Sequence, residues 1–118
     1  DLQFPDLDED CLQDVCSHDP TLEQEVIQMY LESTREALAG MRAALAAGDA
    51  TLLRGLAHGL KGGSRTVGAA AVGELAHEIE RLAETSDFAS AHGALEGAAV
   101  AFEHVAAAME ARALRRAA

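Results

Sequence analysis

His58 is the residue of this sequence best suited to act as a nucleophile, because a neutral imidazole is a competent nucleophile near physiological pH. Successive residues of a helix are about 100° apart, so His58 projects away from the apolar stripe of its segment. Three cations share its side of the helix: Arg54, Lys61 and Arg65. We expect them to disfavour the protonated ring through like-charge repulsion. The pattern predicts a water-exposed nucleophile on a cationic strip.

Four glycines surround this histidine: Gly55, Gly59, Gly62 and Gly63. A glycine inside a helix costs about 1 kcal/mol relative to alanine, so together they forfeit about 3 to 4 kcal/mol. The whole stability of such a domain is about 5 to 15 kcal/mol. That cost indicates a function that needs a bare backbone. Positions without side chains would let the concave site of another molecule close over the imidazole.

The stretch 57–69 contains a motif made of His58, Leu60, Lys61, Gly62, Ser64, Val67, Gly68 and Ala69. It reads H-x-L-K-G-x-S, followed by a V-G-A turn. This motif resembles the hallmark of the histidine-containing phosphotransfer (HPt) domains of bacterial multistep phosphorelays, a helix reading H-x-L-K-G-x-S/A followed by an L/V-G-A turn. A helix that includes 79–80 follows at the distance typical of the family, and the compatible pattern extends over nearly all of the chain. Two departures, Gly59 for a small polar residue and Val72 for leucine, remove no reacting group.

The resemblance implies that an imidazole nitrogen of His58 accepts a phosphoryl group from an aspartate of a receiver domain and passes it to another receiver, or the reverse. Lys61 is then expected to contact the phosphoryl oxygens, and Gly62 to leave space beside the ring. We assign partner docking to four neighbours: Arg54, Gly55, Gly59 and Arg65. In the resembling family the receiver supplies an acidic pocket and a divalent metal, so we expect no cofactor in this chain.

The sequence lacks the motifs of an ATP-dependent kinase. It has no G-x-x-x-x-G-K-[ST] loop and is too short to hold a nucleotide-binding domain beside a helical bundle, so we expect a carrier and not an enzyme. The first hypothesis is the C-terminal module of a hybrid sensor histidine kinase, with a kinase core in the same polypeptide. The absence of methionine at Asp1 agrees with a fragment of a longer chain.

Three other hypotheses stay open. The chain could be a stand-alone carrier, or the phospho-accepting first domain of a chemotaxis-type kinase, whose donor is the ATP of a kinase domain. The competing class is a non-catalytic helical docking module, in which His58 never carries phosphate. Phosphorylation by each kind of donor would separate these hypotheses.

Composition independently predicts one soluble, all-α domain spanning residues 1–118. Aromatic residues make up 3% of the chain and only two prolines occur, a bias toward helices. The net charge of −11 disfavours binding to nucleic acid or to an anionic membrane surface. The sequence has no apolar run of about 20 residues and no secretory leader. We therefore expect a cytoplasmic location, free or tethered to a membrane-bound sensor kinase.

Cys11 and Cys16 are the only cysteines, and their spacing places them on different faces of a short helix, so we expect reduced thiols. Together with His18 they form no metal-ligand spacing, and we expect no metal site. Ser64 is expected to point into the bundle and to bond back to the carbonyl of Leu60. The remaining histidines are interpreted as surface or cap residues: His18, His77, His92 and His104.

Apolar periodicity and capping residues predict five helical segments. The expected ranges are about 7–17, 20–47, 50–67, 70–84 and 87–115. Their boundaries depend on Asp19 before Pro20, Gly48 before Asp49, Gly68, and Ser86 or Asp87. Short connections between long amphipathic helices predict an antiparallel up-down-up-down four-helix bundle, with the first segment packed over one end as an accessory helix. Because its core is satisfied internally, we expect a monomer.

Overall fold

The computed structural model describes residues 6–117, and every regular element in this range is an α-helix. The five helices are α1 (Glu9–Val15), α2 (Pro20–Ala47), α3 (Ala50–Val67), α4 (Ala70–Glu84) and α5 (Phe88–Ala117). The prediction of an all-helical fold is thereby confirmed for these residues. The two ends of the predicted 1–118 domain, residues 1–5 and 118, lie outside the described part of the chain.

Capping residues explain where α2 and α3 begin and end. The carboxylate of Asp19 accepts hydrogen bonds from backbone N–H groups at the start of α2, and Pro20 occupies the first turn. Gly48 ends α2 in the left-handed conformation at φ 67°, and Asp49 caps α3. Gly68 ends α3 at φ 87°. The observed bounds of α2, α3 and α4 coincide with the expected ranges.

The first and last helices differ from the expected ranges. α1 starts later because Asp8 is its N-cap, and it stops earlier because Ser17 and His18 adopt φ angles of 54° and 58°, which a right-handed helix does not allow. α5 starts one residue later because the carboxylate of Asp87 accepts a hydrogen bond from the N–H of Ser90 at 3.1 Å and caps the helix. α5 also continues beyond the expected end at residue 115.

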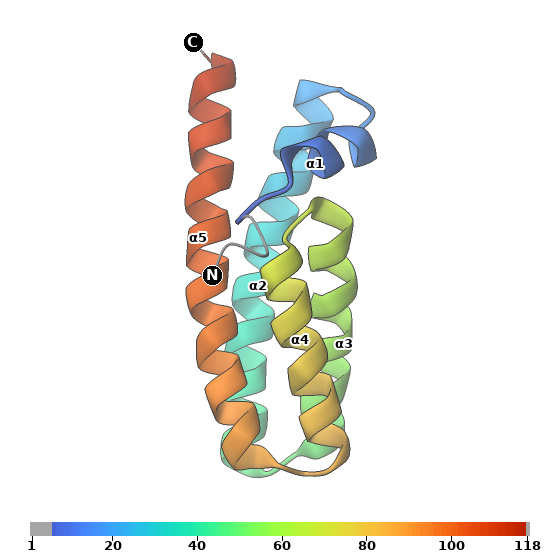
Figure 1. Cartoon of the computed structure of the whole chain (residues 1–118), viewed down its shortest axis with the longest axis vertical. Coiled ribbons are helices and arrows are strands. Elements are labelled where there is room, and N and C mark those ends of the chain that lie inside the picture. The colour runs from blue at the N-terminus through green and yellow to red at the C-terminus, as the bar shows by residue number, and fades with distance from the viewer. Residues whose placement is uncertain (1–5, 118) are drawn as a thin grey trace.

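The helices α2, α3, α4 and α5 lie alongside one another, and the chain turns back at each short connection between them (Figure 1). α3 packs against α2 and α4, and α5 packs against α4 and α2. The short helix α1 packs on α3. The backbone N–H of Asp8 donates to the carbonyl of Gly68 at 2.9 Å, so the start of α1 is tied to the connection between α3 and α4.

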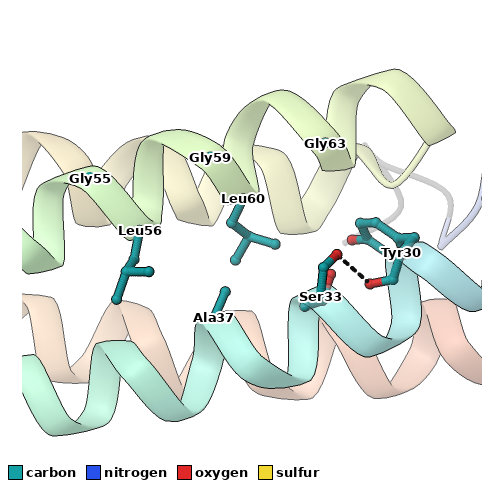
Figure 2. Close-up of a pocket in the computed structure, with 9 residues that line it drawn as sticks. Tyr30, Ser33, Ala37, Gly55, Leu56, Gly59, Leu60 and Gly63 are labelled. Atoms are coloured by element: carbon teal, nitrogen blue, oxygen red, sulfur yellow. Dashed lines mark hydrogen bonds between the residues drawn. The ribbon is translucent and has the colours of Figure 1, made fainter.

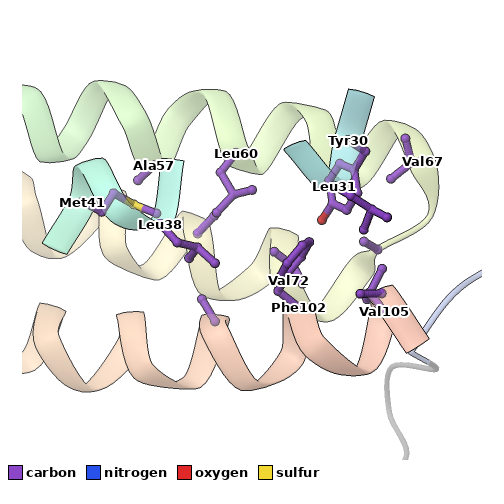
Figure 3. Close-up of a cluster of buried hydrophobic side chains, with 14 of the residues drawn as sticks. Tyr30, Leu31, Leu38, Met41, Ala57, Leu60, Val67, Val72, Phe102 and Val105 are labelled. Atoms are coloured by element: carbon purple, nitrogen blue, oxygen red, sulfur yellow. The ribbon is translucent and has the colours of Figure 1, made fainter. Parts of the chain in front are cut away.

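Side chains from α2 to α5 meet in a hydrophobic core (Figure 3). Its fully buried members include Met41, Leu53, Ile79, Leu95 and Phe102. On α3, Leu53, Leu60 and Val67 recur along one buried face. Burial of that face fixes the rotation of α3 about its axis. The opposite face of the helix, which carries His58, is therefore turned toward solvent.

A buried ion-pair cluster joins α1, α2 and α5. The guanidinium of Arg112 donates to both oxygens of Glu23, at 2.7 and 2.9 Å, and to Glu9 at 2.7 Å. These hydrogen bonds lower the pKa of Glu23 and raise the pKa of Arg112. Loss of Arg112 would leave the buried carboxylate of Glu23 with only Arg116, 3.9 Å away. The hydrogen bonds of Arg112 to Glu9 and Glu23 tie α1 to the two long helices.

Candidate functional site

His58 lies on α3, on the face turned away from the core, and its side chain is 69% exposed. Its Nδ1 lies 2.9 Å from Oε2 of Glu80, a residue of α4. Its other ring nitrogen, Nε2, has no hydrogen-bond partner among residues 6–117. The protein thus orients the ring through one nitrogen and leaves the other available to a reactant.

Glu80 is the carboxylate that orients this histidine. Its side chain is only 10% exposed, and Oε1 accepts a hydrogen bond from Nζ of Lys61 at 2.6 Å. The hydrogen bond from Lys61 and, more weakly, the one from His58 overcome burial and lower the pKa of Glu80 to about 2. Glu80 is therefore ionised at neutral pH and can only accept hydrogen bonds. In the neutral imidazole the proton then resides on Nδ1 and the free lone pair on Nε2.

Lys61 is not free beside the ring of His58, which differs from the expectation from the sequence. Its side chain is 18% exposed and its ammonium is bound to Glu80. The reason is the packing of α4 on α3, which brings one carboxylate against two α3 residues that are neighbours on the helix surface. Lys61 thus holds the carboxylate that holds His58. Its predicted contact with phosphoryl oxygens stays a prediction.

Arg54 and Arg65 are also paired with carboxylates of α4. The guanidinium of Arg54 lies 3.2 Å from Glu84, and that of Arg65 lies 3.3 Å from Glu74. The sequence predicted a cationic strip beside His58, and in the structure each of its three cations is paired with a glutamate of α4. These pairs neutralise the flank, and the like-charge repulsion expected at the ring is weakened accordingly.

Three of the glycines, Gly55, Gly59 and Gly63, face the other flank of α3, toward α2, and line a cavity of about 220 Å³ between the two helices (Figure 2). A Cβ added at any of these positions would meet nothing within 4 Å, and the same holds at Gly62. The structure thus separates the predicted docking residues, with the two glycines beside an open cavity and the two arginines on the ion-paired flank.

Comparison with known proteins identifies the family. A family model described as "Hpt domain" matches residues 25–117. This chain belongs to the HPt family. The crystal structure of histidine-containing phosphotransfer protein B (HptB) from Pseudomonas aeruginosa PAO1 matches it with a TM-score of 0.88 and 28% sequence identity, over 94% of this chain and 96% of that one. The comparison with curated proteins gave no match. The family and the structural match support histidine phosphotransfer in a phosphorelay.

Ser64 of the HPt domain points into the core as predicted, but its hydrogen-bond partner differs. Its hydroxyl shares a 2.8 Å hydrogen bond with the hydroxyl of Tyr30 on α2, whereas the sequence suggested the carbonyl of Leu60. Both hydroxyl groups are buried, and burial raises the pKa of Tyr30. The bond joins α2 to α3, and Tyr30 also lines the glycine-lined cavity. Because this hydrogen bond joins two helices, the sequence of α3 alone does not predict it.

His77 and Glu80 are the site residues that sequence reasoning missed. Nδ1 of His77 is buried, has no hydrogen-bond partner within the described residues, and lies 3.9 Å from Oε1 of Glu80. The interpretation of His77 as a surface residue therefore overlooked its inner nitrogen. Spacing of i and i+3 places both residues on one face of α4, a signal available in the sequence. What the sequence of α4 does not reveal is that this face meets His58.

Histidines, thiols and carboxylates are the side chains of the HPt domain that could bind a metal ion. In the range 6–117, no group of three or more His, Cys, Asp or Glu side chains is arranged to hold a metal ion. Cys11 and Cys16 are free thiols, and burial raises the pKa of each. Among the helices of that range, none is both long enough and apolar enough to cross a membrane.

Proposed function

We propose that this chain is a phosphorelay carrier in which Nε2 of His58 accepts a phosphoryl group from the aspartate of one receiver domain and passes it to another. The observation that carries the proposal is the 2.9 Å contact between Nδ1 and the carboxylate of Glu80. An ionised acceptor at Nδ1 retains the proton there and leaves the lone pair on Nε2. An exposed ring with one engaged nitrogen has a single nucleophilic position.

Transfer exchanges one bond to phosphorus for another. Nε2 donates its lone pair to the phosphorus, the bond between phosphorus and the aspartate oxygen breaks, and the aspartate leaves as a carboxylate. The proton on Nδ1 stays in place, so the phosphorylated ring carries a positive charge. Glu80 stabilises this charge through its hydrogen bond to Nδ1. Transfer to the second receiver runs in the reverse order. An aspartate oxygen of that receiver bonds to the phosphorus, and the bond between phosphorus and Nε2 breaks.

The chain contributes the nucleophile, its orientation and a docking surface. We assign the ATP site to another domain or protein, and the divalent metal to the receiver, so the HPt domain acts as a carrier and not as an enzyme. Lys61 contributes by holding Glu80, and we propose that its ammonium also contacts the phosphoryl oxygens. Gly62 leaves space beside the ring, in keeping with the absence of atoms within 4 Å of an added Cβ.

We further propose the setting in which the carrier works. The side-by-side packing of α2 to α5 supports an antiparallel four-helix bundle with α1 as an accessory helix. We place it, as a monomer, in the bacterial cytoplasm, as the C-terminal module of a hybrid sensor histidine kinase. The first domain of a chemotaxis-type kinase is the alternative, and it differs in its donor, because ATP held by a kinase domain would replace the receiver aspartate.

Phosphoryl donors separate these hypotheses. The purified chain is incubated with phosphorylated receiver domains of the same organism, and separately with histidine kinase cores and ATP, and acid-labile phosphorylation is followed by intact-mass spectrometry. His58→Gln is the test variant, and His92→Gln, an exposed histidine of α5, is the matched control. Labelling by a receiver that is lost only in His58→Gln supports the proposal. Labelling by kinase and ATP alone favours the chemotaxis-type alternative, and failure with every donor favours a docking module.

A further inference from the structure

The ring of His77 has one covered nitrogen and an otherwise accessible surface. Within residues 6–117, its Nδ1 is the one buried side-chain N or O atom without a hydrogen-bond partner. It lies 3.9 Å from Oε1 of Glu80, too far for a hydrogen bond. The side chain as a whole is 44% exposed, so a proton from solvent reaches the ring. Buried polar atoms without partners are rare, and a role in another state of the site gives this nitrogen a physical reason.

The two oxygens of Glu80 face three nitrogens. Oε2 lies 2.9 Å from Nδ1 of His58, and Oε1 accepts from Nζ of Lys61 at 2.6 Å. Nδ1 of His77 faces the same oxygen as Lys61 does. Because the side chain of Glu80 is only 10% exposed, water has little access to replace a donor that leaves. His77 is therefore placed to take over Oε1 whenever the ammonium of Lys61 moves away.

Glu80 is also the group through which charge on α3 reaches His77. The remaining charged side chains of α3 and α4 are paired with one another: Arg54 with Glu84, Arg65 with Glu74, and Arg81 with Glu78. α4 packs on α5 as well, but on another side. Leu75, which an added Cβ at Gly97 of α5 would contact, falls about 160° from His77 around the helix. The proton occupancy of His77 thus depends on Glu80 and on what else binds Glu80.

Phosphorylation of His58 changes what binds Glu80. Under the proposed function the ammonium of Lys61 turns toward the phosphoryl oxygens, and Oε1 loses the donor that it has at 2.6 Å. The phosphoryl group also adds negative charge beside the carboxylate that His77 borders. Both changes favour a protonated imidazole at His77. A displacement of about 1 Å brings its Nδ1 within hydrogen-bond distance of Oε1.

We propose that phosphorylation of His58 is coupled to the binding of one proton by His77. The phosphoryl group passes from the receiver aspartate to Nε2 of His58, and a proton from solvent binds the ring of His77, whose Nδ1–H then donates to Oε1 of Glu80. When the phosphoryl group leaves, Lys61 returns to Oε1 and the proton returns to solvent. This inference rests on the proposed function, because it requires transfer to His58. Acid then favours the phosphorylated carrier, and alkali favours return to the receiver.

The pH dependence of the transfer equilibrium tests this coupling. The chain and one phosphorylated receiver domain are brought to equilibrium, and the phosphorylated fraction of each is measured by intact-mass spectrometry. From about pH 8.5 to about pH 6, the equilibrium of the wild type should shift toward the phosphorylated chain about fivefold more than that of His77→Gln. Other titrating groups, including the ring of His58 and the phosphoryl group, are present in both proteins and cancel. His92→Gln, which removes an exposed histidine of α5, is the matched control and should follow the wild type.

A second variant keeps His77 and removes its competitor. In Lys61→Met, Oε1 of Glu80 lacks the ammonium both before and after phosphorylation, so His77 occupies it in both states. The pH dependence of this variant should match that of His77→Gln although the histidine is present. NMR of the chain labelled with ¹⁵N at histidine reports the proton directly. At about pH 7, phosphorylation of the wild type should convert His77 mostly to the doubly protonated ring and leave His92 unchanged.

A steeper pH dependence in the wild type than in both variants, with proton binding at His77 seen by NMR, supports the coupling. If a receiver exchanges phosphoryl groups with all of these proteins and the wild type shares the pH dependence of His77→Gln, the coupling is overturned and the proposed function stands. A His77 ring whose protonation does not change on phosphorylation overturns it as well. If no receiver domain labels the wild-type chain at any pH, both proposals fail.

Discussion

Replacement of Glu80 by glutamine tests how the site holds its histidine. The hydrogen bonds from Lys61 and His58 lower the pKa of Glu80 from 4.5 to about 2, which corresponds to about 3 kcal/mol of stability. Because the folded-state pKa lies below the unfolded one, this stabilisation is fully present above pH 4.5 and is lost as the pH falls toward 2. Protonation of Glu80 removes about 2 kcal/mol of this stabilisation by about pH 3.

Urea unfolding followed by circular dichroism measures this loss. Between about pH 6 and about pH 3, the free energy of unfolding of the wild type should fall by about 2 kcal/mol more than that of Glu80→Gln. The comparison of pH dependences cancels the constant cost of leaving Lys61 without its partner. Glu84→Gln is the matched control, since it removes an exposed pair with Arg54, and exposed pairs contribute little. It should follow the wild type.

An equal pH dependence in wild type and Glu80→Gln would refute the reasoning, since Glu80 would then titrate in the folded protein as it does in the unfolded chain. The same variant has a functional consequence. A glutamine amide can donate to Nδ1 and place the proton on Nε2 of His58, so phosphorylation by the receiver should slow about tenfold or more, as expected when a ring loses the acceptor that fixes its tautomer. Receiver affinity should be unchanged.

Three further changes probe the frame that carries the site, each by urea or thermal unfolding. Tyr30→Phe leaves the buried hydroxyl of Ser64 unpaired and should cost about 1 to 2 kcal/mol; no loss would mean that another group satisfies it. Gly68→Ala places a Cβ 2.5 Å from the carbonyl oxygen of Asp8 at φ 87° and should lower Tm, and a higher Tm would contradict the tight contact with α1. Arg112→Met leaves the buried carboxylate of Glu23 with only the distant Arg116, at 3.9 Å, and should cost about 3 to 5 kcal/mol; a neutral result would show that the cluster adds no stability.

The long helices could be predicted from sequence because their signals are local. Asp19, Gly48 and Asp49 act on backbone groups within one turn, and the apolar repeat of each helix reports which face is buried. The end of α1 could not be predicted in the same way. Its left-handed residues are Ser17 and His18, and neither side chain marks that conformation as glycine does.

The site could be predicted only where one helix determines it. The exposure of His58 follows from the buried face of α3 alone. The other side chains of the site come from other helices. Glu80, which contacts His58, and His77, which lies near Glu80, come from α4. Tyr30, which forms a hydrogen bond with Ser64, comes from α2. These contacts depend on how one helix packs against another, and the periodicity of a single helix does not specify which residues then meet.

The position of the phosphoryl group on the ring tests the central claim most directly. The chain, labelled with ¹⁵N at histidine, is phosphorylated by a receiver domain, and long-range proton–nitrogen NMR correlations identify the modified nitrogen. We predict one phosphoryl group, on Nε2 of His58, with a proton on Nδ1 held by Glu80. A phosphoryl group on Nδ1 of His58, or on any other residue, would contradict the proposed geometry of transfer.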